Sequence, residues 1–165
     1  MMKAKSTTGL RLGLTGGMAC GKSTAAALLA EAADVARLDT DAIVRDLLKR
    51  DADIHAALMR RHGSDVFDAD GAVLRPALAD IVFKDETELA WIEGLLHPRV
   101  REAWQRRLTA EPDKHWLVEV PLLFENDLAK HFDFIIVVTC SPVLQMNRVV
   151  ERGISPEQAK ARIQR

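Results

Sequence analysis

The sequence is poor in the features that mark secreted, membrane and nucleic-acid-binding proteins. It has only two cysteines in 165 residues, Cys20 and Cys140, so no disulfide framework is indicated. No apolar run approaches the roughly 20 residues that a membrane-spanning helix needs. Glycines break the apolar run after the basic N-terminus, which argues against a cleaved signal. A formal net charge of −1 gives no general attraction to nucleic acid or to anionic membranes. We therefore expect a cytoplasmic protein with neither of those partners.

The composition is that of a folded domain, and its apolar segments alternate with helix-forming segments. The chain is 48% hydrophobic and 28% charged, which is enough apolar material for a core. We find no internal repeat, low-complexity tract or linker. Short apolar runs, typical of strands buried on both faces, occur within residues 10–15, 34–39, 115–125 and 132–142. Because helical segments separate them, we expect an α/β fold with a short parallel sheet and helices on both faces.

The stretch GLTGGMACGKST, residues 13–24, is the strongest motif of the chain. Its second half fits G-x-x-x-x-G-K-[ST], with Gly16, Gly21, Lys22 and Ser23 at the fixed positions. Such a loop between a strand and a helix holds phosphate, because its N–H groups surround the anion at the positive end of the helix. Lys22 reaches the β- and γ-phosphates, and the Ser23 hydroxyl binds Mg²⁺. We expect a nucleotide site made by Gly17, Met18, Ala19, Cys20, Gly21, Lys22, Ser23 and Thr24.

Nucleotide binding leaves three classes of protein open: a phosphotransferase, a GTP-dependent switch and a motor-like ATPase. A GTP switch normally carries N-K-x-D, which reads guanine, and this sequence does not contain it. DADG, residues 68–71, fits the D-x-x-G switch pattern, but its position after SDVF favours a turn. A motor ATPase usually needs a longer chain. A small kinase is the favoured class.

Two aspartates, Asp39 and Asp41, follow the second predicted strand. In parallel sheets ligands bind beyond the carboxyl ends of the strands, so we expect these carboxylates near the bound phosphates. One can accept the proton of a substrate hydroxyl while the other orients water bound to Mg²⁺. The alternative is that Asp41, or Thr40 beside it, only caps the following helix. The spacing is compatible with both interpretations.

Five segments in this order resemble dephospho-coenzyme A kinase, the last enzyme of coenzyme A synthesis. They are LGLTGGMACGKST, LDTDAIVRDLL, LLHPRVR, VEVPLLFE and VVTCSPVLQMNRVVERGISPEQAKARI. The resemblance runs from about Leu10 to the last residue, and LLHPRVR with VEVPLLFE separates it from other small kinases. It implies transfer of the ATP γ-phosphoryl group, with Mg²⁺, to the ribose 3′-hydroxyl of dephospho-coenzyme A. The alternatives are a P-loop kinase for another small hydroxyl compound, or a nucleotide-binding module that truncation has made inactive.

The resemblance also implies a P-loop kinase-like, three-layer α/β/α fold in a single domain, residues 10–165. Its core is expected at about 10–40 and 115–142, its helical substrate lobe at about 41–112, and its lid at about 143–165. The family usually continues for a few tens of residues beyond this point. We therefore expect the last strand and helix of the family fold to be missing here.

By the same resemblance, Asp41 is the catalytic base, and Asp39 and Lys22 complete the catalytic set. Arg45 lies one helical turn after Asp41 on the same helix face, which suits a substrate or phosphate contact. His97 of LLHPRVR would lie in the acceptor pocket. The alternative for His97 is a helix-end histidine that bonds to the backbone.

The VEVPLLFE segment would contribute to the metal site and to the acceptor site. Glu119 resembles the acidic residue that many P-loop enzymes place at the end of the third strand to hold Mg²⁺ through water. Pro121 and Leu122 are the expected acceptor contacts, and Phe124 is a further apolar candidate. Leu122 and Phe124 could equally be core residues.

The C-terminal segment MNRVVERGISPEQAKARIQR suggests a lid that closes over the phosphates. Two helices are expected, residues 142–152 and 155–165, the second with Ser155 as its cap and Pro156 at its first position. Arg148 and Arg152 are four residues apart, so both project from one helix face and can bridge phosphates when the lid closes. A solvated basic face is the alternative.

Two further predictions concern single positions. The HP pair at residues 97–98 should divide residues 86–108 into two helices, because the residue before a proline is steered away from the helical region. Cys20 stands in the loop where the family more often has a small residue such as serine. We hypothesise that oxidation or alkylation of Cys20 blocks nucleotide binding.

Overall fold

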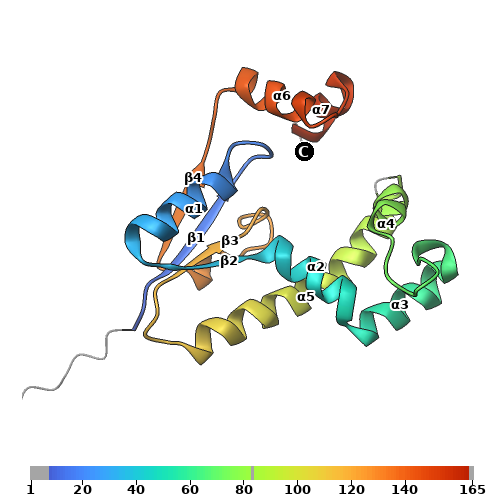
Figure 1. Cartoon of the computed structure of the whole chain (residues 1–165), viewed down its shortest axis with the longest axis horizontal. Helices are drawn as coiled ribbons and strands as arrows, with labels where there is room; N and C mark the ends of the chain where they lie inside the picture. Colours follow the sequence, from blue (N-terminus) through green and yellow to red (C-terminus); the bar gives the residue numbers. More distant parts are fainter. Residues whose placement is uncertain (1–7, 83, 164–165) are drawn as a thin grey trace, which may run out of the picture. The chain divides into compact units, whose positions relative to one another are not determined.

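The sheet of this protein has four parallel strands in the order β2-β3-β1-β4 (Figure 1). The computed structural model describes residues 8–82 and 84–163. Its strands are β1 (Arg11–Gly16), β2 (Ala36–Asp39), β3 (Trp116–Glu119) and β4 (Phe134–Val138). Each strand falls on one of the predicted apolar runs, so the expectation of an α/β fold with a short parallel sheet is confirmed.

Helix α1 (Lys22–Ala33) packs across one face of the sheet. On that face Leu14, Ala26 and Leu117 form a fully buried cluster. Burying one leucine side chain stabilises a fold by roughly 1.5–3 kcal/mol, so this cluster is enough to anchor the helix. Because β1 lies between β3 and β4, the loop that joins β1 to α1 begins in the middle of the sheet edge.

The segment 121–133, which contains the short helix η2 (Ala129–His131), packs on the opposite face of β1. A Cβ atom at Gly13 would lie 2.8 Å from Leu123 Cδ1 and 2.9 Å from Phe132 Cδ2. Leu123 is fully buried in this contact. Close packing on this face therefore requires the absence of a side chain at position 13.

The helices divide between two compact units. The first unit comprises the described residues up to Asp39 and from Ala110 onward, and it contains the sheet, α1, α6 (Pro142–Glu151) and α7 (Pro156–Ile163). The second unit, Thr40–Thr109, is mainly helical, and its limits lie near the 41–112 expected for a helical lobe. Its elements are α2 (Thr40–Arg50), α3 (Ala52–His62), η1 (Gly63–Val66), α4 (Arg75–Val82) and α5 (Glu86–Ala110). Among the described residues, no helix is long and apolar enough to cross a bilayer.

Local signals in the sequence located several turns and helix ends correctly. Ser155 Oγ accepts the N–H of Gln158 at 3.3 Å, so the predicted cap of α7 is confirmed, while residues 164–165 of that predicted helix lie outside the described residues. The Asp68 carboxylate of DADG accepts the N–H of Ala72 at 2.8 Å. This side-chain bond closes a turn, which confirms the turn interpretation of that motif.

The predicted helix break at HP is wrong. Helix α5 continues from Glu86 to Ala110 with Pro98 inside it. An interior proline removes one N–H donor and crowds the carbonyl four residues earlier, which belongs to Gly94. Beside that site, Arg99 Nη1 donates a hydrogen bond to the carbonyl oxygen of Leu95 at 2.9 Å.

Burial explains why α5 continues past its proline. Side chains at every fourth position form one buried stripe along the helix: Ile92, Leu96, Val100, Trp104 and Leu108. At roughly 1.5–3 kcal/mol for each large buried side chain, the stripe outweighs the roughly 3 kcal/mol that an interior proline costs. Tertiary packing therefore overrides the local preference of His97, the residue before the proline.

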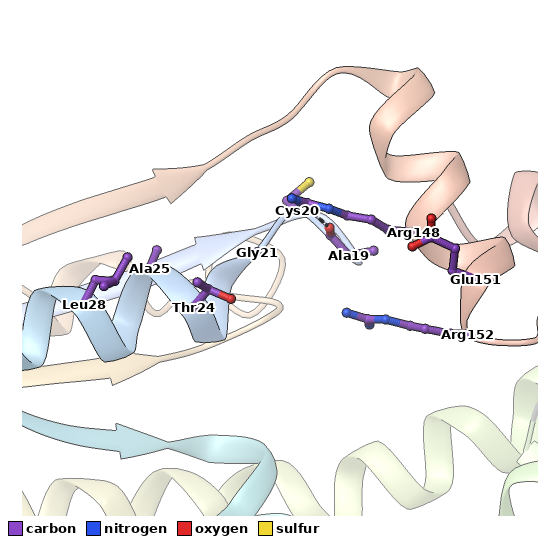
Figure 2. Close-up of a pocket in the computed structure, with 9 residues that line it drawn as sticks. All are labelled: Ala19, Cys20, Gly21, Thr24, Ala25, Leu28, Arg148, Glu151 and Arg152. Atoms are coloured by element: carbon purple, nitrogen blue, oxygen red, sulfur yellow. Dashed lines mark hydrogen bonds between the residues drawn. The ribbon is translucent and has the colours of Figure 1, made fainter.

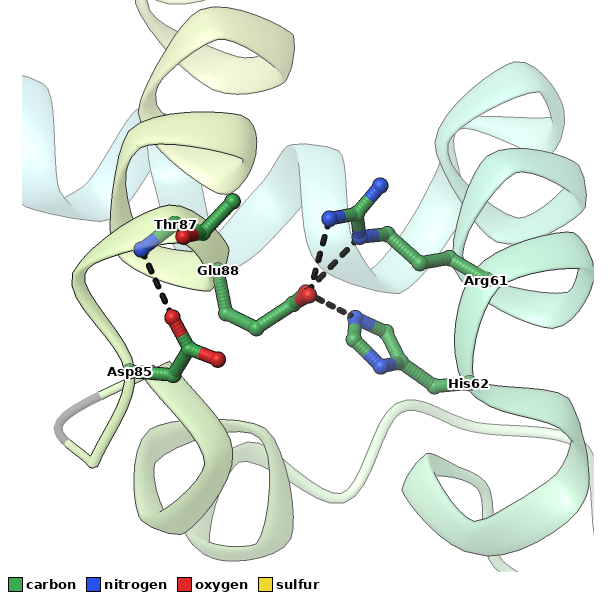
Figure 3. A network of polar contacts seen from close by, with 5 residues as sticks. All are labelled: Arg61, His62, Asp85, Thr87 and Glu88. Atoms are coloured by element: carbon green, nitrogen blue, oxygen red, sulfur yellow. Dashed lines mark hydrogen bonds and ion pairs between the residues drawn. The ribbon is translucent and has the colours of Figure 1, made fainter.

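A polar network ties α3 to the start of α5 inside the second unit (Figure 3). Arg61 donates from Nε to Glu88 Oε2 at 2.7 Å and from Nη2 to Oε1 at 2.8 Å. His62 Nε2 lies 3.5 Å from the same carboxylate, and the Arg61 guanidinium lies 4.7 Å from the ring centroid of Trp91. The hydrogen bonds from Arg61 hold the pKa of Glu88 below its usual value. The ion pair is therefore fully formed at neutral pH.

We expect Pro98→Ala to raise the free energy of unfolding by about 1–2 kcal/mol. The change restores a backbone N–H donor and removes the crowding at Gly94, and a freer unfolded chain offsets part of that gain. Urea unfolding at neutral pH measures it. Pro156→Ala is the matched control, because Pro156 stands at the first position of α7, where proline costs little. A lower unfolding midpoint for Pro98→Ala would contradict the prediction and would mean that the buried stripe needs a proline kink.

Candidate functional site

The phosphate loop leaves the sheet at Gly16, where two strand ends meet closely. Gly16 has φ +146°, a region that favours glycine. A Cβ atom at this position would lie 2.1 Å from the carbonyl oxygen of Val138 on β4. Glycine is therefore required here for both backbone conformation and close approach.

Lys22 folds back over the loop that precedes it. Its Nζ donates to the carbonyl oxygens of Gly16, at 2.7 Å, and Gly17, at 3.0 Å. A lysine ammonium has three donors, so two loop carbonyls leave it capacity for a further acceptor. The sequence motif predicted that Lys22 reaches bound phosphates, and the structure places its ammonium group against the first residues of the loop.

The first turn of α1 follows the loop directly. Gly21 forms the N-terminal boundary of α1 with φ +97°. Ser23 and Thr24 follow in the first turn, and both are exposed. The first N–H groups of a helix have no partner within the helix and carry its positive dipole end, so this turn can bind an anion.

Asp39 and Glu119 end adjacent strands on the face of the sheet that α1 covers. They are register partners in the parallel pair β2–β3, and Leu14 of the α1-facing cluster pairs with Glu119 across β1–β3. Glu119 is only 4% exposed and forms an ion pair with Arg37. The arginine offsets the repulsion between two neighbouring carboxylates. The predicted roles of Asp39 and Glu119 stay predictions.

Helix α6 docks on the phosphate loop through two polar side chains. Gln145 Nε2 donates to the carbonyl oxygen of Met18 at 2.9 Å, and Arg148 Nη1 donates to that of Ala19 at 3.2 Å. Ala19 has φ +57°, which is uncommon for a residue with a side chain. Side chains of the predicted lid therefore hold the loop in a strained conformation.

An apolar cluster supports the same contact. Ala19 of the loop, Val149 of α6 and Ala159 of α7 are buried together. Partly buried side chains surround them: Met18, Met146, Ile154 and Ile163. The loop, α6 and α7 thus share one small core within the first unit.

A pocket of about 500 Å³ opens between the loop and α6 (Figure 2). Its lining comes from the loop, the start of α1 and the end of α6: Ala19, Cys20, Gly21, Thr24, Ala25, Leu28, Arg148, Glu151 and Arg152. Figure 2 shows Arg148 of α6 and Arg152, the residue that follows α6, extending toward the loop side. The structure therefore brings both predicted arginines to the predicted nucleotide residues. The exposed apolar side chain of Leu28 adds a surface that suits a ring rather than a phosphate.

The predicted acceptor residues of the first unit lie on its surface. Leu122 is 44% exposed and Phe124 is 56% exposed, so neither is a core residue. Within residues 121–125 the buried side chain is that of Leu123, which packs near Gly13. The carbonyl of Pro121 accepts a hydrogen bond from Thr15 Oγ1 at 3.1 Å, which ties this segment to β1.

The remaining predicted residues belong to the second unit. Asp41 and Arg45 are exposed on α2, while Ile43 and Leu48 of that helix are buried. Since α2 begins at Thr40, Asp41 lies inside the first turn, where the helix dipole favours a carboxylate. His97 is half-buried inside α5, so the helix-end interpretation of that histidine is wrong. The predicted substrate contacts of Arg45 and His97 stay predictions.

Sequence reasoning missed two residues of the first unit that the structure places at the loop. Gln145 precedes Arg148 by three positions, and this helical spacing marks the same face of α6 and could have identified it. Cys140 lies with its sulfur 3.5 Å from Cys20 Sγ, a contact across 120 positions that no local pattern reveals. Burial and the hydrogen bond to Cys20 raise the pKa of the Cys140 thiol.

The oxygen ligands near the loop suit a cation that arrives with a nucleotide. In residues 8–82 and 84–163 no three His, Cys, Asp or Glu side chains are grouped so as to hold a metal by themselves. Mg²⁺ in phosphotransfer sites usually takes one or two protein oxygens and completes its shell with phosphates and water. The Ser23 hydroxyl and the strand-end carboxylates are of that kind.

We expect Gly16→Ala to lower the free energy of unfolding by at least about 3 kcal/mol and to abolish ATP binding. The reason is the added clash with Val138 together with the strained φ. Gly71→Ala is the matched control, because Gly71 has φ +79° and a Cβ there would meet nothing within 4 Å. Backbone strain alone should cost about 1–2 kcal/mol in the control. If urea unfolding shows the same loss of unfolding free energy in both variants, the close approach to Val138 contributes nothing to stability.

The comparisons with known proteins agree on one family. The sequence profile of dephospho-CoA kinase matches residues 10–165. The chain is 35% identical over 153 residues to the dephospho-CoA kinase of Nostoc sp. and 39% identical over 156 residues to that of Thermobifida fusca. These alignments cover 92% and 93% of this chain, respectively, and 78% of each relative.

Solved structures give the same result at the level of the fold. The crystal structure of TT1252 from Thermus thermophilus has a TM-score of 0.78 and 31% identity, and the match covers 94% of this chain and 78% of that one. A dephospho-CoA kinase from Campylobacter jejuni, at 24% identity, shares the fold with a TM-score of 0.59, over 93% of this chain and 77% of its own. The chain belongs to the dephospho-CoA kinase family, whose reaction phosphorylates dephospho-CoA with ATP in the last step of coenzyme A synthesis.

Proposed function

We propose that the phosphate loop binds the ATP phosphates, that Asp41 acts as general base, and that the acceptor group is the ribose 3′-hydroxyl of dephospho-CoA. The observation that carries the proposal is the convergence of Lys22, the first turn of α1 and Arg148 on one loop. A kinase transition state needs little covalent help from the protein. It needs positioned donors and cations around the transferred phosphoryl group.

The ATP phosphates take the place of groups that now satisfy one another. Lys22 Nζ binds two loop carbonyls, and a phosphate oxygen is a charged acceptor that forms a stronger hydrogen bond with an ammonium group. Arg148 and Arg152 add two guanidinium groups in the pocket that Thr24 also lines. Leu28 and Ala25 offer the apolar part of that pocket to the nucleoside.

Asp41 is suited to the role of base by its exposure. It stands on the exposed side of α2, and only Thr40 separates it from Asp39 at the end of β2. Its carboxylate accepts the proton of the 3′-hydroxyl, the 3′-oxygen forms a bond to the γ-phosphorus, and ADP leaves with the electrons of the broken P–O bond. Asp39 would assist Asp41 through its negative charge at the end of β2.

Mg²⁺ would be held by the Ser23 hydroxyl and, directly or through water, by Glu119. Bound with ATP, it would neutralise charge on the β- and γ-phosphate oxygens. The ion pair with Arg37 orients the Glu119 carboxylate at the end of β3.

Four side chains are assigned to binding of dephospho-CoA. Two of them are Arg45, which is exposed, and His97, which is half-buried. The other two are Pro121 and Leu122, and the exposed Leu122 suits an apolar group of the acceptor.

The compartment proposed for this protein is the cytoplasm. A chain with only two cysteines has no disulfide framework, which suits a reducing compartment. Cell fractionation with an antibody against the chain would test this assignment.

We expect Asp41→Asn to lower kcat by about 10²–10⁴-fold with little change in the KM for ATP, because it removes the proton acceptor alone. The assay couples ADP release with and without dephospho-CoA, and mass spectrometry of the product should find one added phosphate. Asp46→Asn is the matched control, since Asp46 lies on the same helix and pairs with Arg50.

Three outcomes of this assay would contradict the proposal in different ways. Equal activity of Asp41→Asn and the unchanged chain would remove Asp41 as the base. ADP release that does not depend on dephospho-CoA would indicate another acceptor. ATP binding without any ADP release would favour a nucleotide-binding module.

We expect Arg148→Ala and Arg152→Ala each to raise the KM for ATP by roughly tenfold or more. A hydrogen bond to a charged group is worth about 1.5–3 kcal/mol, and each 1.4 kcal/mol corresponds to a factor of ten. Lys160→Ala, which removes an exposed charge from α7, is the control. Unchanged KM values for both arginine variants would support the alternative of a solvated basic face.

A further inference from the structure

The two cysteines of the chain lie against each other where the phosphate loop meets the entry to α6. Cys20 belongs to the loop before α1, and Cys140 belongs to the connection between β4 and α6. Their sulfur atoms are 3.5 Å apart, with Cys140 donating its S–H to Cys20. Because 120 positions separate them in sequence, only the fold brings these thiols together.

Small oxidants can reach the thiol pair through Cys140. Cys140 is half-buried, whereas Cys20 is buried but lines the pocket of Figure 2. Burial and the bond to Cys20 raise the pKa of the Cys140 thiol, and the nearby charge of Arg148 opposes that rise. The contact between the two sulfurs places a second thiol where it can resolve a sulfenic acid formed on the first.

We propose that Cys20 and Cys140 form a peroxide-sensitive dithiol, and that its oxidation to a disulfide switches the nucleotide site off. One thiolate attacks a peroxide oxygen, which gives a sulfenic acid and one water. The second thiol attacks the sulfenic sulfur, which forms the S–S bond and releases a second water. The two thiols lose two electrons and two protons, and one hydrogen peroxide is reduced to two waters. A reducing dithiol restores both thiols by exchange.

The disulfide changes the loop because the two sulfurs must move together. A disulfide bond is about 2.05 Å long, so the present 3.5 Å separation must shorten by about 1.5 Å. Cys20 stands between Ala19 and Gly21, two residues with positive φ whose conformations set the loop. A displacement of about 1 Å in a positioning element can lower a reaction rate by about 10²-fold. Oxidation should therefore lower activity by about that factor.

The inference rests on the nucleotide site proposed above, and its first readout does not depend on turnover. Hydrogen peroxide is added to the reduced full chain without other reductant, and intact mass should show the loss of two hydrogen atoms. Trypsin should then release one cross-linked product that joins residues 12–22 to residues 131–148. ATP binding and kinase activity should both fall and should both return after dithiothreitol. If the reduced chain has no kinase activity, the cross-link and the change in ATP binding still decide this inference.

Cys140→Ser is the decisive variant, because Cys140 lies outside the proposed phosphate contacts. We expect its reduced form to keep full activity and ATP affinity, and peroxide treatment to produce no reversible loss. Cys20→Ser is the second variant, in case Cys140→Ser fails to fold. Each peroxide-treated Cys20→Ser sample is compared with its own untreated sample, and we expect no reversible loss of activity or ATP binding.

Two results would overturn the inference. One is a wild-type chain that keeps two free thiols, with no cross-link, after peroxide has inhibited it. The other is a Cys140→Ser variant that peroxide inhibits reversibly and as strongly as the wild type, since that would assign the effect to Cys20 alone.

Discussion

The phosphate loop of this protein depends on the close approach of two strand ends at Gly16. The absence of a side chain there lets the backbone of β1 turn directly above the carbonyl of Val138, and the loop starts from that point. Lys22 then reaches back to the loop carbonyls, and α1 begins directly after the loop, so that its N-terminal dipole end lies beside it. A parallel sheet with β1 inside it is what makes this edge available.

The second constraint is the contact between the loop and α6. Two hydrogen bonds to loop carbonyls and a small apolar cluster hold the loop at Ala19 in a backbone conformation that is uncommon for a residue with a side chain. The groups that hold the loop include one of the arginines assigned to the phosphates, so α6 both supports the loop and presents charge to it. Because α6 contacts the loop and also carries an arginine assigned to the phosphates, nucleotide binding can change the position of α6, as it does in closing lids.

The second unit shows how burial decides against a local rule. The HP pair should have ended a helix, yet α5 passes through Pro98 because a buried stripe runs through both of its halves. Local stereochemistry sets a cost of a few kcal/mol, and several buried side chains exceed it. The same continuity places His97 within a helix, which changes what that histidine can contact.

Patterns between near neighbours determined most of what is confirmed: the four strands, the phosphate loop, the turn at Asp68 and the Ser155 cap follow from residue types at fixed short spacings. The motifs also led to the kinase family, because a phosphate loop carries its chemistry in a few adjacent residues. Only tertiary structure decided the continuity of α5, the exposure of Leu122 and Phe124, the ion pair of Glu119 with Arg37, and the contact of Cys20 with Cys140. These features depend on which distant segments pack together, and the energy of that packing is absent from any local pattern.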